Sequence, residues 1–447
     1  MFIFSTIALL GVLCAVFPED GLAMGGLSLR FPSITEVLSG RTSDNAADPE
    51  EVIAQREKAV KAAERKEMEE YMASDPARIH MPDGNQAYMD SFFAALEDAG
   101  SKHVGIVHYG DSQLEEDRIT FTYRERLQER FGGNGAGLQC AKKNYTLAES
   151  VHCNREHTQY MVYGDESLRA GMNRYGPMGQ FSRADSASVF SIRPTKANDG
   201  ASAIFNRVKL YSGNLRSPLT VSCKGERKVV EGKASLNITE FALPDSTSSV
   251  NLSVAGLGDL YGISLTSDTG VEVDNIAMRS CSGTIFTAIN QDQLRDYFKD
   301  CDARLIILQF GGNGVPYMKT GKSISSYCST IRRQIGRIRE LAPGVPVLFI
   351  GPSDMATSTG GKRQTWPHLE TFIDSLQTNV NASGAAYWNL YEVMGGNGSM
   401  TSWVKHQPPL AGPDYIHFTK LGAEKVGNLF ADVLLLYHDF YKLREDE

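Results

Sequence analysis

The chain has 447 residues, of which 42% are apolar and 22% are charged. This composition is typical of a globular protein, and the length suits two domains or one domain with a large insertion. The formal net charge of −8 and the lack of a long basic run argue against a nucleic acid as partner.

Residues 1–17 are mostly apolar and contain no Lys or Arg. A run of this length suits the core of a signal peptide or a marginal membrane anchor, although the usual basic residues before it are missing. We interpret residues 1–24 as such a segment. The protein is then expected to be exported, in the periplasm or at the cell envelope, with a membrane tether if the segment is retained.

Residues 25–74 are predicted to form a linker and a charged helix. Residues 25–49 are rich in Gly, Ser, Pro and Asp, which is typical of a tether, whereas residues 50–72 are rich in Ala, Glu, Lys and Arg. Two interpretations of this helix stay open. It is either a spacer that holds the rest of the chain off a membrane, or a solvated helix on the surface of the folded part.

Residues 75–143 alternate between helix and strand. The pattern predicts a helix over 88–100, a strand over 103–109 and a second helix over 113–130. Ser112 of the Gly-Asp-Ser sequence therefore falls at a strand-to-helix turn. Free backbone N–H groups and a positive dipole end at such a turn suit a nucleophile whose attack creates an oxyanion. The ordinary alternative is a serine that caps the helix.

Between residues 144 and 274 the apolar pattern changes to a period of two. Short alternating segments, separated by Gly, Asp, Pro and Ser clusters, occupy residues 189–192, 208–211, 219–222, 235–238, 250–254 and 261–265. Regularly spaced short strands predict a β-sandwich. Because the motifs described below lie on both sides of it, we interpret this segment as an insertion.

From residue 275 onward the alternation of helix and strand resumes. The pattern predicts helices over 285–299, 323–341, 366–382 and 419–437, and strands over 304–310, 345–350 and 386–390. This βαβ rhythm predicts a parallel sheet between two layers of helices. Ser112 and Asn313 each follow a strand, so both are expected at the carboxyl edge of that sheet, where such folds bind ligands.

Asp414 and His417 lie three residues apart near the end of the chain. A serine is a poor nucleophile until a base removes its proton, and an imidazole base needs a carboxylate to fix its tautomer. An Asp-x-x-His loop supplies both groups, and Ser112 completes a Ser-His-Asp set. The Gly-Asp-Ser and Asp-x-x-His motifs together resemble those of the SGNH (GDSL) hydrolases.

This family has two further motifs, which carry donors to the oxyanion. Asn313 of Gly-Gly-Asn-Gly follows the apolar strand at 305–310, so its amide is the expected side-chain donor. The usual last residue of this motif is Asp, but here it is Gly314, which removes a carboxylate that often steadies the loop. The glycine motif resembles Ser282-Gly283, so Gly283 N–H and Ser112 N–H are the expected backbone donors.

An SGNH domain interrupted by a β-sandwich resembles the peptidoglycan O-acetylesterases and related carbohydrate esterases, whose inserted domain is similar to carbohydrate-binding jelly rolls. The resemblance implies an α/β fold, a three-layer flavodoxin-like parallel sheet flanked by helices, with an inserted all-β jelly roll or sandwich. It divides the chain into an anchor or signal peptide (1–24), a linker and helix (25–74), the hydrolase domain (75–143 and 275–447) and the insertion (144–274).

The resemblance also implies that the protein removes O-acetyl groups from a glycan through an acyl-enzyme, with neither a metal nor an organic cofactor. Tyr160, Tyr163, Tyr175 and Tyr261 offer rings for stacking on sugars, although aromatic residues in a sandwich belong mostly to its core. Three alternatives stay open. They are an O-acetyltransferase with the same triad, a lipid or thioester hydrolase, and a non-catalytic glycan-binding surface protein, which the change to Gly314 would suit.

Overall fold

The computed structural model describes residues 2–18, 21–24, 27–29, 31–39, 49–232 and 234–445. The described residues up to Glu69 form one compact unit, and those from Glu70 onward form another. The division falls within helix α3 (Pro49–Ser74).

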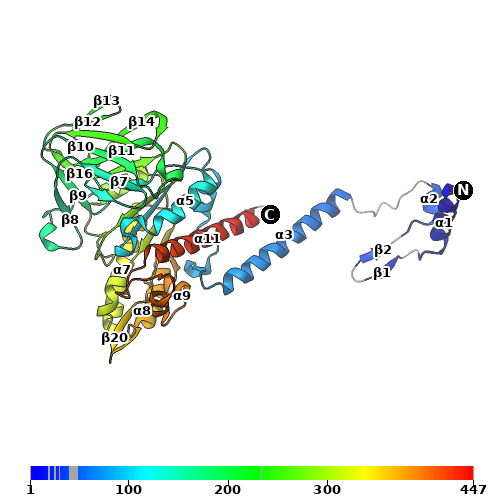
Figure 1. Cartoon of the computed structure of the whole chain (residues 1–447). Helices are drawn as coiled ribbons and strands as arrows, with labels where there is room; N and C mark the ends of the chain where they lie inside the picture. The colour runs from blue at the N-terminus through cyan, green and yellow to red at the C-terminus, as the bar shows by residue number, and fades with distance from the viewer. Residues whose placement is uncertain are drawn as a thin grey trace. The chain divides into compact units, whose positions relative to one another are not determined.

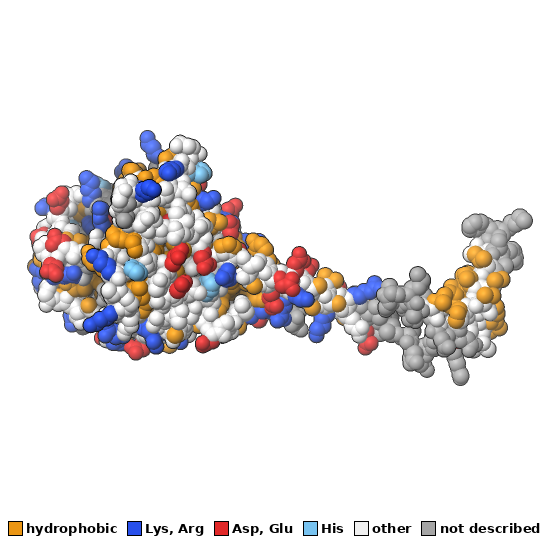
Figure 2. Space-filling view, turned by 90° about the horizontal axis from the view of Figure 1, so that it is seen from below, with side chains coloured by type: hydrophobic (Ala, Val, Ile, Leu, Met, Phe, Trp, Pro, Cys, Tyr) orange, Lys and Arg blue, Asp and Glu red, His pale blue; other side chains and the backbone are white. Residues whose placement is uncertain are grey.

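The first unit begins with helix α1 (Phe2–Val16), which lies in the predicted anchor or signal peptide. Apolar side chains are exposed on this helix, as Figure 2 shows, and they are Leu9, Leu10, Val12, Leu13 and Val16. None of the described helices is both long enough and apolar enough to cross a membrane.

The predicted tether contains regular structure. Strand β2 (Leu27–Leu29) pairs with β1 (Leu22–Met24), and helix α2 (Ile34–Ser39) follows. The rest of the predicted tether, at 25–26, 30 and 40–48, lies outside the described residues. Helix α3 matches the predicted charged helix, and its role as a spacer or surface helix stays a prediction.

The second unit, which begins within α3 (Figure 1), is built on a sheet with the strand order β17-β4-β18-β19-β22-β3. Its strands are β3 (Ile79–His80), β4 (His103–Gly110), β17 (Gly270–Ala277), β18 (Ala303–Gln309), β19 (Val347–Ile350) and β22 (Ala386–Trp388). All neighbours pair in parallel except β3, which is antiparallel to β22. The predicted α/β fold with a parallel sheet is therefore confirmed.

Helices pack on both faces of this sheet. They are α4 (Asp90–Glu97), α5 (Thr120–Phe131), α6 (Gln291–Asp300), α7 (Gly321–Leu341), α8 (Leu369–Asn381), α9 (Leu390–Met394), α10 (Ser399–Lys405) and α11 (Lys420–Glu445). Because strand residues alternate, Val107 and Tyr109 of β4 join a core with α6, α7 and α8, while His108 contacts Tyr123 of α5 and Phe430 of α11. The result is three layers.

The helix predicted over 113–130 is wrong at its start. A short 3₁₀ segment, η2 (Ser112–Asp117), follows β4, and α5 begins only at Thr120. Glu116 and Asp117 have positive φ angles of 61° and 63°, which break the helix. The buried Asp117 carboxylate accepts two hydrogen bonds from the Arg124 guanidinium, at 2.6 and 3.0 Å, and one from the Thr120 hydroxyl. This ion pair outweighs local helix propensity.

Two antiparallel sheets lie between the halves of the parallel sheet in sequence. Their orders are β13-β12-β15-β10-β7-β6 and β14-β11-β16-β9-β8, with β5 also paired to β16. Their strands are β5 (Gly137–Gln139), β6 (Asn144–Tyr145), β7 (Glu149–Cys153), β8 (Thr158–Met161), β9 (Gln180–Ala184), β10 (Ser188–Pro194), β11 (Phe205–Gly213), β12 (Leu219–Cys223), β13 (Glu226–Val230), β14 (Asn237–Thr247), β15 (Val250–Ala255) and β16 (Gly258–Thr266).

The two antiparallel sheets share one hydrophobic core, to which Phe190 and Leu252 contribute from the first and Leu210 and Ile263 from the second. The boundaries of the antiparallel sheets differ from the predicted 144 and 274. Strand β5, before residue 144, pairs with β16 of the antiparallel sheets, whereas β17, which begins before residue 274, belongs to the parallel sheet. All these strands lie within the second compact unit. That the segment is a separate inserted domain stays a prediction.

Helix α6 joins the second antiparallel sheet to the parallel sheet. The Asp300 carboxylate accepts hydrogen bonds from the Tyr211 hydroxyl at 2.6 Å and from Lys209 Nζ at 3.0 Å. Gln293 Nε2 donates to the Tyr261 hydroxyl at 2.8 Å. These buried and half-buried contacts fix the antiparallel sheets on the parallel one.

The buried Arg124–Asp117 pair is testable against an exposed pair on the same helix. Replacing Arg124 by Met leaves a buried carboxylate without its cation, so the free energy of unfolding should fall by about 3–5 kcal/mol. Arg126→Met breaks the exposed pair with Asp432 and should cost about 1 kcal/mol or less. Urea-induced unfolding of the two variants measures both values, and equal losses would contradict this account.

Candidate active site

The carboxyl ends of three adjacent strands bring the predicted motifs together. Gly110 at the end of β4 lies opposite Ala277 at the end of β17 and Gln309 at the end of β18. The segments that follow these strands carry Ser112, Ser280 and Asn313, which line one cavity of about 560 Å³. His417 reaches the same cavity from the loop before α11.

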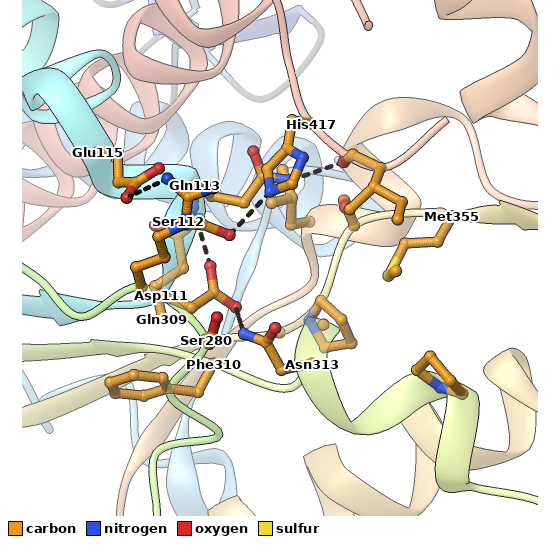
Figure 3. A pocket seen from close by; sticks show the side chains of 18 of the residues that line it. Asp111, Ser112, Gln113, Glu115, Ser280, Gln309, Phe310, Asn313, Met355 and His417 are labelled. Atoms are coloured by element: carbon orange, nitrogen blue, oxygen red, sulfur yellow. Dashed lines mark hydrogen bonds and ion pairs between the residues drawn. The ribbon is translucent and has the colours of Figure 1, made fainter. Parts of the chain in front are cut away.

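Ser112, His417 and Asp414 form a chain of hydrogen bonds. Ser112 Oγ lies 2.8 Å from His417 Nε2, and His417 Nδ1 lies 2.7 Å from Asp414 Oδ2 (Figure 3 shows the first contact). Because the Asp414 carboxylate can only accept a hydrogen bond, this contact favours the neutral imidazole with its proton on Nδ1. Nε2 is then left to accept the serine proton. The geometry is that of a nucleophile, a base and an orienting carboxylate.

The Asp414 carboxylate is held by its own loop. Its Oδ1 accepts the backbone N–H groups of Ile416 at 3.0 Å and of His417 at 3.1 Å. Partial burial raises the pKa of Asp414, but the hydrogen bonds from the His417 ring and from these two N–H groups outweigh it, so the pKa lies below its usual value. The carboxylate therefore stays charged and available to the imidazole.

Gln113 ties the serine turn to the histidine loop. Its side chain is buried, its Nε2 donates to the carbonyl oxygen of Ile416 at 2.8 Å, and its Oε1 accepts from Phe418 N–H at 3.4 Å. One amide thus holds both sides of His417. The motifs did not identify this residue, since a glutamine after Gly-Asp-Ser carries no signal until the loop that it contacts is known.

A hairpin supports the same loop from another direction. Strands β20 (Ala356–Thr359) and β21 (Lys362–Thr365) pair with each other, and Ala356 N–H donates to the carbonyl oxygen of Tyr415 at 3.1 Å. The Arg363 guanidinium lies 4.4 Å from the centre of the Tyr415 ring. The Asp-x-x-His loop is thus held by long-range contacts as well as by its own hydrogen bonds.

Asn313 points toward the serine turn from η5 (Gly312–Tyr317). Its Nδ2 donates to Asp111 Oδ2 at 3.3 Å, as Figure 3 shows, and to the carbonyl oxygen of Cys281 at 3.0 Å. The structure therefore brings the predicted side-chain donor to the site. The carboxylate that contacts this loop belongs to Asp111, whereas position 314 is a glycine.

Asp111 is a buried acid beside Ser112. Its Oδ1 accepts Gln113 N–H at 3.0 Å, and burial raises its pKa from the usual 3.8 to about 6, against the opposite effects of that N–H and of His417. The residue caps η2 and holds the Asn313 amide at the same time. It therefore links the turn that carries Ser112 to the turn that carries Asn313. The structure records no hydrogen bond between the described side chains of Asp111 and His417.

Gly283, the predicted backbone donor, is not brought to the site. It is buried away from the cavity, its N–H faces Cys281 Sγ at 3.4 Å, and a Cβ on it would meet the Phe310 ring. The chain after β17 turns at Met278, whose carbonyl accepts Cys281 N–H at 3.0 Å, with Ser280 at a φ of 61°. This tight turn presents Ser280 to the cavity (Figure 3).

Ser280 was missed because no residue type marks it. A glycine is expected where φ is positive, whereas here a serine adopts that conformation. Its position could have indicated it. Ser280 lies three residues after the end of β17, much as Ser112 lies two residues after the end of β4.

Comparison with known proteins gives a likeness of fold. No protein-family model matches the sequence, and no curated protein does. A solved peptidoglycan O-acetylesterase superposes with a TM-score of 0.65 at 20% identity, over 79% of this chain and 97% of that one. A family two carbohydrate esterase from Cellvibrio japonicus gives a TM-score of 0.27 at 11% identity, over 65% and 99%. The TM-score of 0.65 shows that this chain shares the fold of that solved peptidoglycan O-acetylesterase.

The raised pKa of Asp111 predicts a pH effect on stability. Between pH 4 and 6 the folded chain holds a proton on this carboxyl that the unfolded chain has already lost, so the free energy of unfolding falls as pH rises. The fall should be about 2–3 kcal/mol. Asp111→Asn should lack this component in urea titrations at each pH, whereas parallel curves for variant and wild type would contradict the assignment.

Proposed function

We propose that this protein is a serine carbohydrate esterase, which removes O-acetyl groups from a cell-wall or other polysaccharide through an acyl-enzyme. The observation that carries the proposal is the continuous contact from Ser112 through His417 to Asp414, at 2.8 and 2.7 Å, on the wall of a cavity lined with hydrogen-bond donors. Each step of the reaction uses side chains and backbone groups of this chain.

In the first half of the reaction His417 Nε2 removes the Ser112 proton while Oγ attacks the acetyl carbonyl. The carbonyl π electrons move to oxygen, and the tetrahedral species collapses when His417 returns the proton to the departing sugar oxygen. The sugar hydroxyl leaves, and the acetyl group stays on Ser112. Water then attacks the acetyl-serine by the same route, and acetate and the free serine result.

Three groups are suited to stabilise the oxyanion. They are the Ser112 N–H, the Asn313 carboxamide and, in place of Gly283, the Ser280 N–H. Asn313 donates to Asp111 and to the Cys281 carbonyl in the absence of substrate, so the oxyanion must replace one of these acceptors. The two contacts hold the amide in the orientation that the transition state needs, which lowers the cost of reorganisation.

A glycan is the substrate that the fold and the site support best. The fold is that of a solved peptidoglycan O-acetylesterase, and the cavity combines Phe310, Pro352 and Met355 with the charged side chains of Glu115 and Arg118. Sugars present both apolar faces and hydroxyl groups, so they suit such a mixed lining. We further propose that the antiparallel sheets form an inserted glycan-binding sandwich, and that residues 1–24 export the protein or anchor it at the cell envelope.

Acetate release tests the proposal. The full chain should release acetate from O-acetylated peptidoglycan or from acetylated xylan, and Ser112→Ala should release none above background, because the nucleophile is lost. Release from peptidoglycan would indicate a cell-wall substrate, and release from xylan alone would indicate polysaccharide degradation.

Two outcomes would contradict the proposal. Equal behaviour of wild type and Ser112→Ala, with no acetate from either substrate, would leave glycan binding as the function. Transfer of acetyl groups to an added sugar acceptor, in place of free acetate, would identify an O-acetyltransferase with the same triad.

Asn313→Ala separates oxyanion stabilisation from substrate binding. Loss of one donor that acts mainly in the transition state should lower kcat by about 10²–10³ with little change in KM. Asn397→Ala is the matched control, because this exposed amide contacts Glu370 outside the cavity. A change in KM alone would indicate that Asn313 only binds substrate.

A further inference from the structure

A second cavity of about 540 Å³ adjoins the one that contains Ser112. It lies where the antiparallel strands meet the parallel sheet, with walls from η2, β17 and the segment from β5 to β8. Its volume is in the range of small-molecule sites, about 300–1,000 Å³. Of the residues to which we assign a part in the reaction, Ser280 alone lines this second cavity.

The two cavities share part of their walls. Glu115, Arg279 and Ser280 line both of them. Figure 3 shows Glu115 beside Ser112, on the side of the serine opposite to Met355. The Arg279 guanidinium is 76% exposed and lies 3.5 Å from Glu115 Oε1, so it is free to exchange this partner for a ligand group at the junction. A ligand can therefore extend from the serine into the second cavity.

Each cavity has one exposed aromatic ring at its edge. Tyr317, 72% exposed, lines the cavity with Ser112, and Tyr145, 67% exposed, lines the second. In the described part of residues 75–445, these are the two aromatic side chains that are mostly exposed. The tyrosines that the sequence offered for sugar stacking are largely packed, since Tyr163, Tyr175 and Tyr261 are at most 5% exposed.

Polar side chains inside the second cavity match the hydroxyl groups of sugars. Lys142 Nζ lies 3.2 Å from Gln180 Oε1, and Asn144 lines the same wall. An ammonium group and two carboxamides together donate and accept hydrogen bonds, as a hydroxyl group requires. Acidic and basic groups both occur here, which does not favour an acyl chain.

We propose that the second cavity is a glycan subsite and that one glycan strand occupies both cavities. The sugar that carries the acetyl group lies at Ser112 near Tyr317, the strand crosses Glu115 and Arg279, and a more distant sugar stacks on Tyr145 in the second cavity. This inference rests on the proposed function and deepens it, because it makes the substrate a strand of several sugars.

Chain length is the variable that tests this subsite. Fragments of O-acetylated peptidoglycan, from the disaccharide to the octasaccharide, should be deacetylated by the wild type with a kcat/KM that rises about tenfold with length. Tyr145→Ala should remove this rise, measured relative to the kcat/KM for 4-nitrophenyl acetate, which fills only the catalytic cavity. Val229→Ala, an exposed apolar residue of β13, is the control and should keep the rise.

Binding of non-acetylated fragments to Ser112→Ala separates this inference from the proposed function. The affinity of Ser112→Ala, measured by calorimetry, should increase with fragment length. Adding Tyr145→Ala should lower the affinity for the octasaccharide about tenfold and leave the affinity for the disaccharide unchanged. Length-dependent binding, together with no acetate release by the wild type, would support the subsite and contradict the esterase. Acetate release and affinity that are both independent of length would overturn the subsite and leave the esterase in place.

Discussion

The register of three parallel strands decides the geometry of the candidate site. β4 pairs with β17 and β18 so that Gly110, Ala277 and Gln309 end at one level of the sheet. Each strand is then followed within a few residues by a group that lines the same cavity. A shift of one residue in either pairing would turn the alternating side chains to the opposite face and move the following turn. Burial on both faces of the sheet resists such a shift.

The same sheet accommodates a long excursion of the chain between β4 and β17. The segment after α5 and the start of β17 lie in contact, since Val271 N–H donates to the carbonyl of Gly132 at 2.9 Å. Gly133 and Gly270 approach so closely that a Cβ on Gly270 would lie 2.1 Å from Gly133 N. The chain therefore leaves and re-enters at nearly one point, and the antiparallel sheets extend the cavity without disturbing the register of the parallel strands.

Burial differs between the two sides of the contact between Ser112 and His417. Asp111 and Gln113, next to Ser112, are buried and hydrogen bonded, whereas the side chains of Asp414 and His417 are 47% and 36% exposed. The serine turn is thus fixed by the core, and the histidine loop by a few specific contacts from Gln113 and the β20–β21 hairpin. Such an arrangement holds the distances between Ser112, His417 and Asp414 while it leaves the imidazole accessible from the cavity.

The sequence alone determined the parallel α/β sheet and the residues of the candidate site that carry motifs, because apolar periodicity and short motifs are local properties of the chain. Ser112, Asp414, His417 and Asn313 were found in this way, and the structure brings them together. Only the tertiary structure decided the rest. The late start of α5 depends on the buried Arg124–Asp117 pair, and the position of Ser280 on the cavity wall, where Gly283 was expected, depends on a turn with positive φ at a serine. The pair is buried against β17, where Arg124 Nε donates to the Val273 carbonyl at 3.0 Å, and no local pattern of residue types records this contact or the positive φ.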